Sequence, residues 1–169
     1  MNKKKIINDP VYGFITIPTD LIYDIIEHPF FQRLRRIKQL GLTDIVYPGA
    51  LHTRFHHALG AMHLMSEAIE SLRFKGHNIS DAEYEATLVA ILLHDLGHGP
   101  FSHLIEEITS VNHDKLGFKL AGLLSDEIRK SGGDMEYIGK LFKRQNPFYK
   151  IVMDKNMGMD KLDYLFRDI

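Results

Sequence analysis

The sequence contains no cysteine among its 169 residues. This absence excludes disulfide bonds and thiolate metal sites, and it fits a reducing compartment. Histidine and carboxylate side chains are therefore the ligands from which any metal site would be built. The sequence also has almost no net charge, because 21 basic and 22 acidic residues give a formal charge of −1. Nucleic acid and anionic membranes are thus not indicated as partners, and any phosphate binding must come from local basic residues.

Long apolar runs are missing too. No run approaches the roughly 18 residues of a transmembrane helix, and no apolar segment typical of a signal peptide is present, so we expect a cytoplasmic protein. Internal repeats and low-complexity segments are not seen either. With 44% hydrophobic residues, the chain can bury one substantial core, and we expect a single domain over residues 1–169.

Turn, capping and periodicity signals predict an all-α fold with at most one small two-stranded β appendage. Extended segments are expected at residues 6–10, 11–17 and 43–47, the last two as short strands. Ser80 and Glu83 have the spacing of a capping box and predict the start of a helix. The expected helices are residues 20–26, a second from Pro29 to about residue 40, one that carries His57 and ends near residue 76, one from residue 81 to His94 and Asp95, one through residue 108, and then 113 to about 130, 135–143, 148–153 and 160–168.

The stretch from Ala90 to His103 carries most of the recognisable chemistry. An apolar run typical of a buried helix is followed by the adjacent pair His94 and Asp95, and then by His98 and His103. A wet helix end would explain one histidine there. Three histidines and a carboxylate in so short a stretch favour a site for a divalent metal.

The remaining ligands of such a site must come from elsewhere, because neighbouring residues of a helix point about 100° apart and cannot surround an ion alone. Two other segments offer candidates. The first is RFHHALG at residues 54–60, where an apolar helical face follows His57. The second is MDKLDY at residues 159–164.

A histidine, a His-Asp pair and a distant aspartate in this order resemble the HD phosphohydrolases. RFxHxLG at residues 54–60 and DKxDYxxRD at residues 160–168 narrow the resemblance to the deoxynucleotide triphosphohydrolases, the group of the sterile-alpha-motif-and-HD-domain enzyme and its bacterial relatives. Matching segments run from Ile6 to Asp168. The resemblance implies an HD-domain helical bundle. A typical member continues with more helices after the last motif, so we expect residues 1–169 to be an N-terminal fragment of a longer chain.

The resemblance implies that His57, His94, Asp95 and Asp160 hold a divalent metal ion, with iron, manganese or zinc expected and magnesium able to accompany the nucleotide. Two neutral imidazoles and two carboxylates leave such an ion near neutral, with positions open for water and a phosphate oxygen. His56, next to His57, falls where relatives often carry an acid and could be mistaken for the ligand, but the motif aligns His57 with that role. Read locally, Asp160 also fits a helix N-cap.

The catalytic roles also follow from the resemblance. His98 and His113 are placed near the scissile bond, with His113 as general acid, and His103 is a phosphate contact. Glu106 falls where relatives have an aspartate that partners a catalytic histidine, so its longer side chain is a departure from the pattern. Read locally, His98 also fits a histidine at a helix start, and Asn112-His113 also fits a helix cap.

Substrate contacts are implied in the same way. Arg54 and Lys161 would hold phosphates, and Tyr164 would bond near the triphosphate and crowd the sugar 2′ position. Gln39 and Asp168 would read the 3′-hydroxyl. Individually, the charged members of this set also fit an ordinary solvated surface.

A regulatory site is implied near the N-terminus. In the relatives, the positions of five residues help form a guanine-nucleotide site between subunits: Lys5, Asn8, Glu27, Gln32 and Arg35. A carboxylate such as Glu27 can accept two hydrogen bonds from guanine that adenine cannot offer. The basic run at residues 33–38 equally fits a solvated helix face. If the site exists, the protein is a homo-oligomer with a guanine-nucleotide effector.

The sequence thus predicts metal-dependent hydrolysis of deoxynucleoside triphosphates to deoxynucleoside and inorganic triphosphate. One alternative is another HD phosphohydrolase acting on a nucleoside monophosphate, a cyclic dinucleotide or an alarmone. A second alternative is a non-catalytic regulatory or nucleic-acid-binding HD module. An intact set of histidines argues against the non-catalytic module, because a structural metal does not need His98 or His113.

Overall fold

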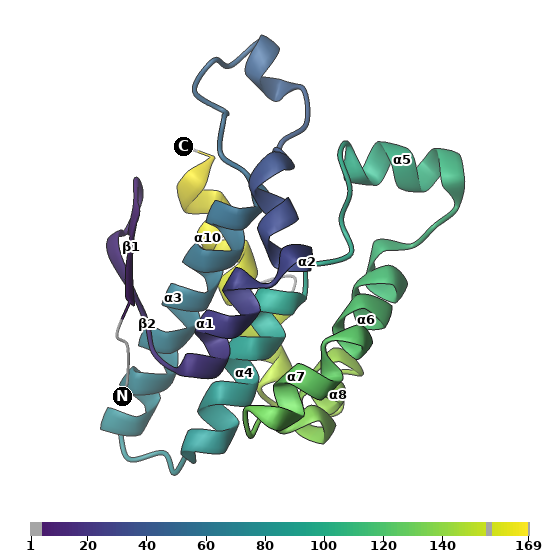
Figure 1. Cartoon of the computed structure of the whole chain (residues 1–169). Coiled ribbons are helices and arrows are strands. Elements are labelled where there is room, and N and C mark those ends of the chain that lie inside the picture. The colour runs from purple at the N-terminus through teal and green to yellow at the C-terminus, as the bar shows by residue number, and fades with distance from the viewer. Residues whose placement is uncertain (1–4, 155–156, 169) are drawn as a thin grey trace.

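The computed structural model describes residues 5–154 and 157–168, without the side chains of Ser102, His103, Asp114 and Met153 (Figure 1). The described part folds as a helical bundle with one two-stranded antiparallel sheet, which confirms the all-α prediction. The strands are β1 (Lys5–Asp9) and β2 (Gly13–Ile17). The α-helices are α1 (Asp20–Glu27), α2 (Pro29–Gln32), α3 (Arg54–Phe74), α4 (Asp81–Leu93), α5 (Ser102–Thr109), α6 (His113–Leu123), α7 (Ser125–Lys130), α8 (Met135–Phe142), α9 (Tyr149–Met153) and α10 (Met159–Arg167), and two 3₁₀ turns are η1 (Arg33–Arg36) and η2 (Thr43–Ile45).

Local signals explain where several of these elements begin. Thr19 is the N-cap of α1, and its hydroxyl accepts a hydrogen bond from the Ile22 backbone N–H. Ser80 and Glu83 form the expected reciprocal capping box at the start of α4. The hairpin pairs Ile7 with Ile15, which confirms an extended segment followed by a strand in this region.

Three expectations about secondary structure are wrong. Residues 43–47 form no strand but the 3₁₀ turn η2, and Ile45 is 74% exposed, because no described strand lies alongside to bury these β-branched residues. The second helix is shorter than expected, because α2 stops at Gln32 and the 3₁₀ turn η1 stops at Arg36 instead of about residue 40. Ile37 is extended, and its carbonyl accepts from the Arg54 N–H. The helix expected from residue 113 to about 130 is divided at Leu124 into α6 and α7.

The core is organised around α4. Its residues from Ala86 to Leu93 are all buried, so the helix is apolar on every side and passes through the middle of the bundle. The long helix α3 packs against it, α10 packs against α3, and α8 packs against α4 (Figure 1). The C-terminal end of α4 and the N-terminal ends of α3 and α10 meet in one region. They bring His94, His57 and Asp160 of the expected metal site together there.

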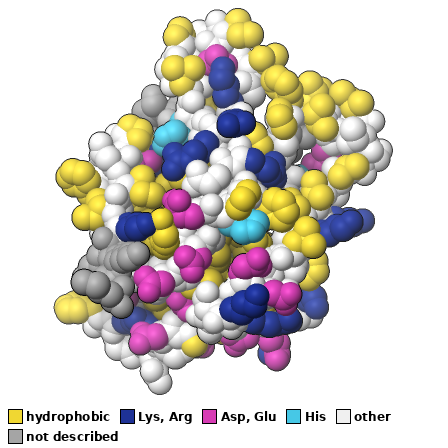
Figure 2. Space-filling view, in the orientation of Figure 1, with side chains coloured by type: hydrophobic (Ala, Val, Ile, Leu, Met, Phe, Trp, Pro, Cys, Tyr) yellow, Lys and Arg dark blue, Asp and Glu magenta, His cyan; other side chains and the backbone are white. Residues whose placement is uncertain are grey.

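Two segments project from this bundle. The connection that contains η2 rises at one end, and α5 stands away from the neighbouring helices (Figure 1). Hydrophobic side chains are exposed on both, among them Val46 at 73% and Ile108 at 71%, and yellow side chains gather over these segments in Figure 2. None of the described helices combines the length and the apolar character needed to span a membrane.

Candidate metal centre and active-site cleft

Three of the expected ligands converge on one point. His57 Nε2 lies 2.9 Å, and His94 Nε2 3.0 Å, from Asp160 Oδ1. The ligand atoms of these three residues all lie within 4.8 Å of one another. Asp160 is the second residue of α10, whose N-cap is Gly158, so the alternative of Asp160 as a helix N-cap is wrong.

The other ring nitrogens of the two histidines are held in place. His57 Nδ1 lies 2.7 Å from Asp163 Oδ2, and His94 Nδ1 hydrogen-bonds to the Ile91 carbonyl. Anchored Nδ1 atoms leave both Nε2 atoms directed at the same point, which is the arrangement that metal-ligating histidines adopt. His56 instead caps α3, where its Nδ1 accepts from the Thr53 N–H, and the geometry therefore favours His57 over His56. The residues present fit a divalent ion.

Asp95 lies beside this cluster and connects it to three further groups. Its oxygens lie 3.4 Å from His94 Nε2 and 3.8 Å from His57 Nε2. Oδ2 also accepts from Arg54 Nη1 at 2.5 Å, and Oδ1 lies 3.3 Å from His98 Nε2. The carboxylate is thus shared between the candidate metal site, the Arg54 guanidinium and the His98 imidazole.

Charge balance in the cluster shifts the pKa of every ligand. Burial opposes the charged form of His57, but hydrogen bonds with Asp160 and Asp163 outweigh it and raise its pKa to about 9. Burial is likewise outweighed at His94, where the charges of Asp95 and Asp160 raise the pKa to about 10. The pKa of Asp95 and that of Asp160 are held below the usual range despite burial, chiefly by the charge of His94. Protons on the two histidines therefore offset the carboxylates in the metal-free protein, and a metal ion would replace them.

The cluster lies in the wall of a cleft of about 670 Å³. His94, Asp95 and Asp160 line it. Five more of the expected site residues line the same cleft: Gln39, Arg54, His98, His113 and Tyr164. Three basic residues that the sequence did not single out also line it: Lys115, Lys143 and Arg144. Cations and titratable groups thus surround the space next to the candidate metal site.

His98 and His113, which line the cleft, form a second connected group with Glu106. The imidazole rings of His98 and His113 stack with centroids 3.9 Å apart and an interplanar angle of 21°. His113 Nδ1 lies 2.6 Å from Glu106 Oε2, and this hydrogen bond lowers the pKa of Glu106. The longer side chain of glutamate therefore still reaches the histidine. Asn112 donates to Glu106 Oε1 and also caps α6, so the local cap and the histidine contact occur together.

The remaining expected substrate residues are more dispersed. Asp168 Oδ1 lies 3.2 Å from His52 Nε2, and both line a neighbouring cavity of about 500 Å³. Lys161 is partly buried on α10, and it is not among the described residues that line the main cleft. The side chain of His103 lies outside the described residues.

The five residues of the expected regulatory site lie along β1, α1, α2 and η1. The Lys5 ammonium is 3.2 Å from the centre of the Tyr23 ring. Arg35 donates to Gln32 Oε1 at 2.7 Å and stacks over the Phe55 ring. Asn8 and Glu27 are exposed. The guanine-nucleotide effector stays a prediction.

Several residues near the centre were not identified from the sequence. Arg33 donates to the backbone carbonyls of Leu96 and His98 and so holds the turn after Asp95. Asp163 and Arg167 form a buried pair on α10, with Arg167 Nε 2.9 Å from Asp163 Oδ2. A usable signal was present, because Asp160, Asp163 and Arg167 recur at helical spacing and therefore share one face.

Comparison with known proteins places this geometry in a family. A model described as HD domain matches residues 54–150. A phosphohydrolase of Bacteroides thetaiotaomicron has a crystal structure that superposes with a TM-score of 0.88 at 49% sequence identity, over 98% of this chain and 41% of that one. The uncharacterized protein YwfO of Bacillus subtilis is 37% identical over 99% of this chain and 40% of its own length.

A further relative is the deoxynucleoside triphosphate triphosphohydrolase SAMHD1 homolog of Dictyostelium discoideum, which is 35% identical over 97% of this chain and 36% of its own length. The chain thus spans between 36% and 41% of the length of these three proteins. HD domains bind divalent metal ions, in agreement with the cluster of His57, His94 and Asp160. By the matched residues and the overall similarity, the chain belongs to the HD domain family, within the HD phosphohydrolase superfamily.

Proposed function

We propose that this protein hydrolyses deoxynucleoside triphosphates to deoxynucleoside and inorganic triphosphate with the help of a divalent metal ion. The observation that carries the proposal is that the cluster of His57, His94 and Asp160 borders one cleft, which Arg54 and the stacked pair His98 and His113 also line. The name of the Dictyostelium relative supports the choice of substrate. The cleft of about 670 Å³ has the size of a small-molecule site.

Each group in the cleft has a chemical task in this reaction. The bound metal, when present, supplies a Lewis acid for a phosphate oxygen and for the attacking water. Water adds at the α-phosphorus, the bond from that phosphorus to the 5′-oxygen breaks, and the leaving oxygen takes a proton. We assign that proton to His113, which Glu106 orients through the 2.6 Å hydrogen bond at Nδ1. Arg54 offsets charge that develops on the phosphate, with His98 beside it.

We assign recognition of the sugar to Gln39, Asp168 and Tyr164. Gln39 and Tyr164 line the cleft, and Asp168 lines the neighbouring cavity. His52 contacts both Asp168 and Gln39, because its ring meets Asp168 and its backbone carbonyl accepts from the Gln39 N–H. Gln39 and Asp168 would bond the 3′-hydroxyl, while Tyr164 would leave little room for a 2′-hydroxyl. Lys161 and His103 keep their proposed roles as phosphate contacts.

The test is a substrate panel with identified products. Protein loaded with Mn²⁺, Fe²⁺ or Zn²⁺ is incubated with each deoxynucleoside triphosphate, a ribonucleoside triphosphate, a deoxynucleoside monophosphate, a cyclic dinucleotide and an alarmone. Phosphorus NMR then distinguishes inorganic triphosphate from pyrophosphate and phosphate. Inorganic triphosphate from deoxynucleotides alone supports the proposal. Turnover of one of the other compounds would instead select the alternative HD phosphohydrolase, and no turnover by the full-length natural protein with intact metal binding would select a non-catalytic module.

A guanine nucleotide at the N-terminal site, and a homo-oligomer that this nucleotide stabilises, are further parts of the proposal. Arg35 and Lys5 would meet phosphates and Glu27 the guanine edge. An effector that binds between subunits must bind the assembled form more tightly, so it would also favour assembly. Sedimentation with and without GTP, on the wild type and on Glu27→Ala, tests this part separately from the substrate panel.

A further inference from the structure

A line of buried charged side chains connects the N-terminal hairpin to His57. His57 Nδ1 lies 2.7 Å from Asp163 Oδ2, and Arg167 Nε lies 2.9 and 3.1 Å from the two oxygens of Asp163. Arg167 Nη1 in turn lies 3.0 Å from Asp9 Oδ2. The side chains of these four residues are at most 1% exposed. Charges are seldom buried so completely unless each has a partner.

Asp9 ties this line to the shape of the hairpin. Its Oδ1 accepts from the backbone N–H groups of Val11 and Tyr12, at 2.9 and 3.2 Å, and so builds the turn between β1 and β2. Its Oδ2 faces Arg167. One carboxylate therefore shapes the turn and also partners a cation on α10, at the edge of the bundle where Figure 1 shows the hairpin.

Helix α3 is shaped to admit the line. Gly60 lies one turn after His57, and a Cβ added there would overlap the side chains of Asp163, Arg167 and Tyr12. The Tyr12 ring lies against the Arg167 guanidinium, with 5.4 Å from its centre to Cζ. A glycine at this point of a helix costs stability compared with alanine, and here it makes room for the charged side chains.

The arrangement has a consequence for the metal ligand. A carboxylate that holds Nδ1 of a histidine fixes the ring orientation and makes Nε2 the better ligand. Asp163 is shared between His57 and Arg167, so a stronger ion pair with Arg167 would weaken the hydrogen bond between Asp163 and His57. Asp9 contacts the same guanidinium from the other side and limits the strength of the ion pair between Arg167 and Asp163.

We propose that Asp163, Arg167 and Asp9 act as positioning residues for His57, so that the turn of the N-terminal hairpin helps to determine the affinity of the metal centre. The inference rests on the metal centre of the proposed function, and it is independent of the substrate. Any partner or effector that displaces the hairpin would change metal affinity through this connection, because both ends belong to one network of buried charges.

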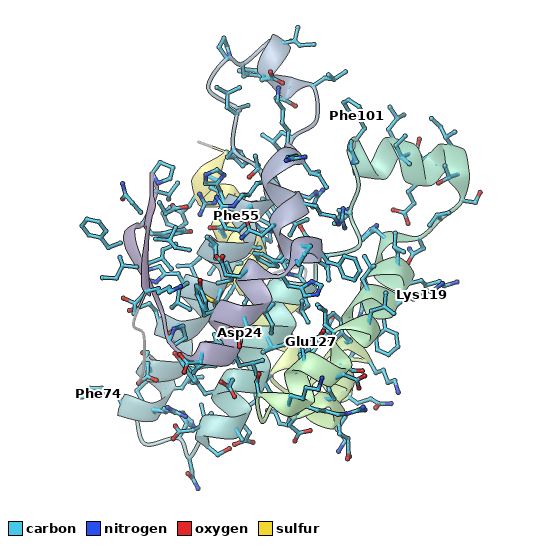
Figure 3. The ribbon with its side chains drawn as sticks, in the orientation of Figure 1. Asp24, Phe55, Phe74, Phe101, Lys119 and Glu127 are labelled. Carbon is cyan, nitrogen blue, oxygen red and sulfur yellow. The ribbon has the colours of Figure 1, made fainter. Side chains whose placement is uncertain are left out.

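The experiment is a titration of the metal-free protein with Mn²⁺ by calorimetry, which needs no nucleotide. Asp163→Asn should weaken Mn²⁺ binding roughly 10- to 100-fold, the usual effect of losing the partner of a ligating histidine. Asp9→Asn should weaken it less, roughly 2- to 30-fold, because it acts through two intervening residues. The matched control is Asp24→Asn, an exposed carboxylate on α1 (Figure 3), which should leave the affinity unchanged.

The double variant separates positioning from general loss of stability. If Asp9 acts through Asp163, then Asp9→Asn should have almost no further effect on Mn²⁺ affinity in the Asp163→Asn background. Equal affinities for Asp9→Asn and Asp24→Asn, or fully additive effects in the double variant, would overturn the proposal. The metal titration gives this answer whether or not the chain hydrolyses deoxynucleotides.

A measurement on the unmodified protein covers the case in which a variant does not fold. In the Zn²⁺-loaded protein, nitrogen-detected NMR should show His57 with a proton on Nδ1 and the metal at Nε2. Coordination through Nδ1, or a solvent-exchanging proton there without a carboxylate partner, would also contradict the proposal.

Discussion

At the scale of single residues, the contact of His113 with Glu106 is the most direct link between structure and chemistry. His113 Nδ1 lies 2.6 Å from Glu106 Oε2, and the His113 ring stacks on His98. We predict that His113→Ala lowers kcat roughly 100-fold or more, as expected for loss of a general acid, while metal content is retained. Steady-state kinetics with metal analysis of the same samples measures both quantities. A variant that loses its metal would show that His113 is a ligand.

Glu106 has a separate prediction because it acts through His113. Glu106→Ala should lower kcat roughly 10-fold or more, since the imidazole loses the group that orients it. The neighbouring Glu107→Ala is the control and should behave as the wild type. In a His113→Ala background, Glu106→Ala should add little, because residues that act as a unit are not additive. Additive losses would separate the two residues.

The pKa shifts of His57 and His94 predict how the stability of the metal-free protein depends on pH. Their folded pKa values of about 9 and about 10 lie above the value of about 6.5 for an unfolded chain. Such groups contribute stability below pH about 6.5, and this contribution is lost as the pH rises through the folded pKa values. The free energy of unfolding should therefore fall by an amount on the order of a few kcal/mol between about pH 6.5 and about pH 10.

Binding of a metal should reverse this trend, because the ion takes the place of the two protons and binds better as they leave. Urea unfolding of EDTA-treated and Mn²⁺-loaded protein, at several pH values in that range, compares the two states. The difference between them should widen with rising pH. A metal-free protein whose stability stays constant or increases between about pH 6.5 and about pH 9 would contradict the assignment.

At the scale of elements, Arg33 shows how one segment positions another. Its guanidinium, half-buried in η1, donates to the carbonyls of Leu96 and His98 and thereby fixes the turn that follows α4. Arg33→Ala should lower the free energy of unfolding by about 1.5–3 kcal/mol, the usual contribution of hydrogen bonds to a charged group, and should slow hydrolysis. Arg36→Ala, at an exposed position of the same 3₁₀ turn, should change stability by less than about 0.5 kcal/mol. Urea unfolding measures the stability of both variants, and equal losses would show that Arg33 does not position the turn.

The elements also show how far the sequence alone predicts the structure. Helix starts were predictable where the signal is local, as with Thr19 and the pair Ser80 and Glu83, because caps involve residues within one turn. Segment 43–47 has the composition of a strand but forms η2, since a strand needs a partner that no local pattern supplies. The early end of the second helix has the same cause, because Lys38 pairs with Thr53 fifteen residues later.

The site was predictable to a similar extent. The resemblance implied His57, His94, Asp95 and Asp160 as metal ligands, and three of them, His57, His94 and Asp160, do converge. The motifs that carry the resemblance could not show that Asp95 is shared with Arg54, or that Asp9 lies against Arg167. Contacts between residues so far apart in the sequence depend on how the helices pack. They are established only by the tertiary structure.

At the scale of the whole molecule, the net charge of −1 provides no long-range attraction for a polyanionic substrate. The cleft nevertheless concentrates cations on its walls: Lys115 from α6, and Lys143 and Arg144 from the end of α8. Arg144 has a φ of +59°, a left-handed conformation that residues other than glycine seldom adopt. This conformation ends α8 in a Schellman motif, in which the Arg144 N–H donates to the Leu141 carbonyl and the Gln145 N–H to the Lys140 carbonyl. The helix end therefore presents Lys143 and Arg144 to the cleft.

We therefore predict that the double variant Lys143→Ala/Arg144→Ala raises KM for deoxynucleoside triphosphates roughly 10-fold at low salt, with little change in kcat. Both cations would contact phosphates equally in the ground state and the transition state, and such binding affects KM and not kcat. The matched control is Lys119→Ala/Lys130→Ala, which removes the same net charge from exposed positions away from the cleft; Lys119 is labelled on α6 in Figure 3. The difference between the two double variants should shrink as salt is raised, because exposed charges are screened. If both double variants raise KM equally, only the overall charge matters. If the cleft variant lowers kcat instead, these cations act in the transition state and belong with Arg54 in the catalytic group.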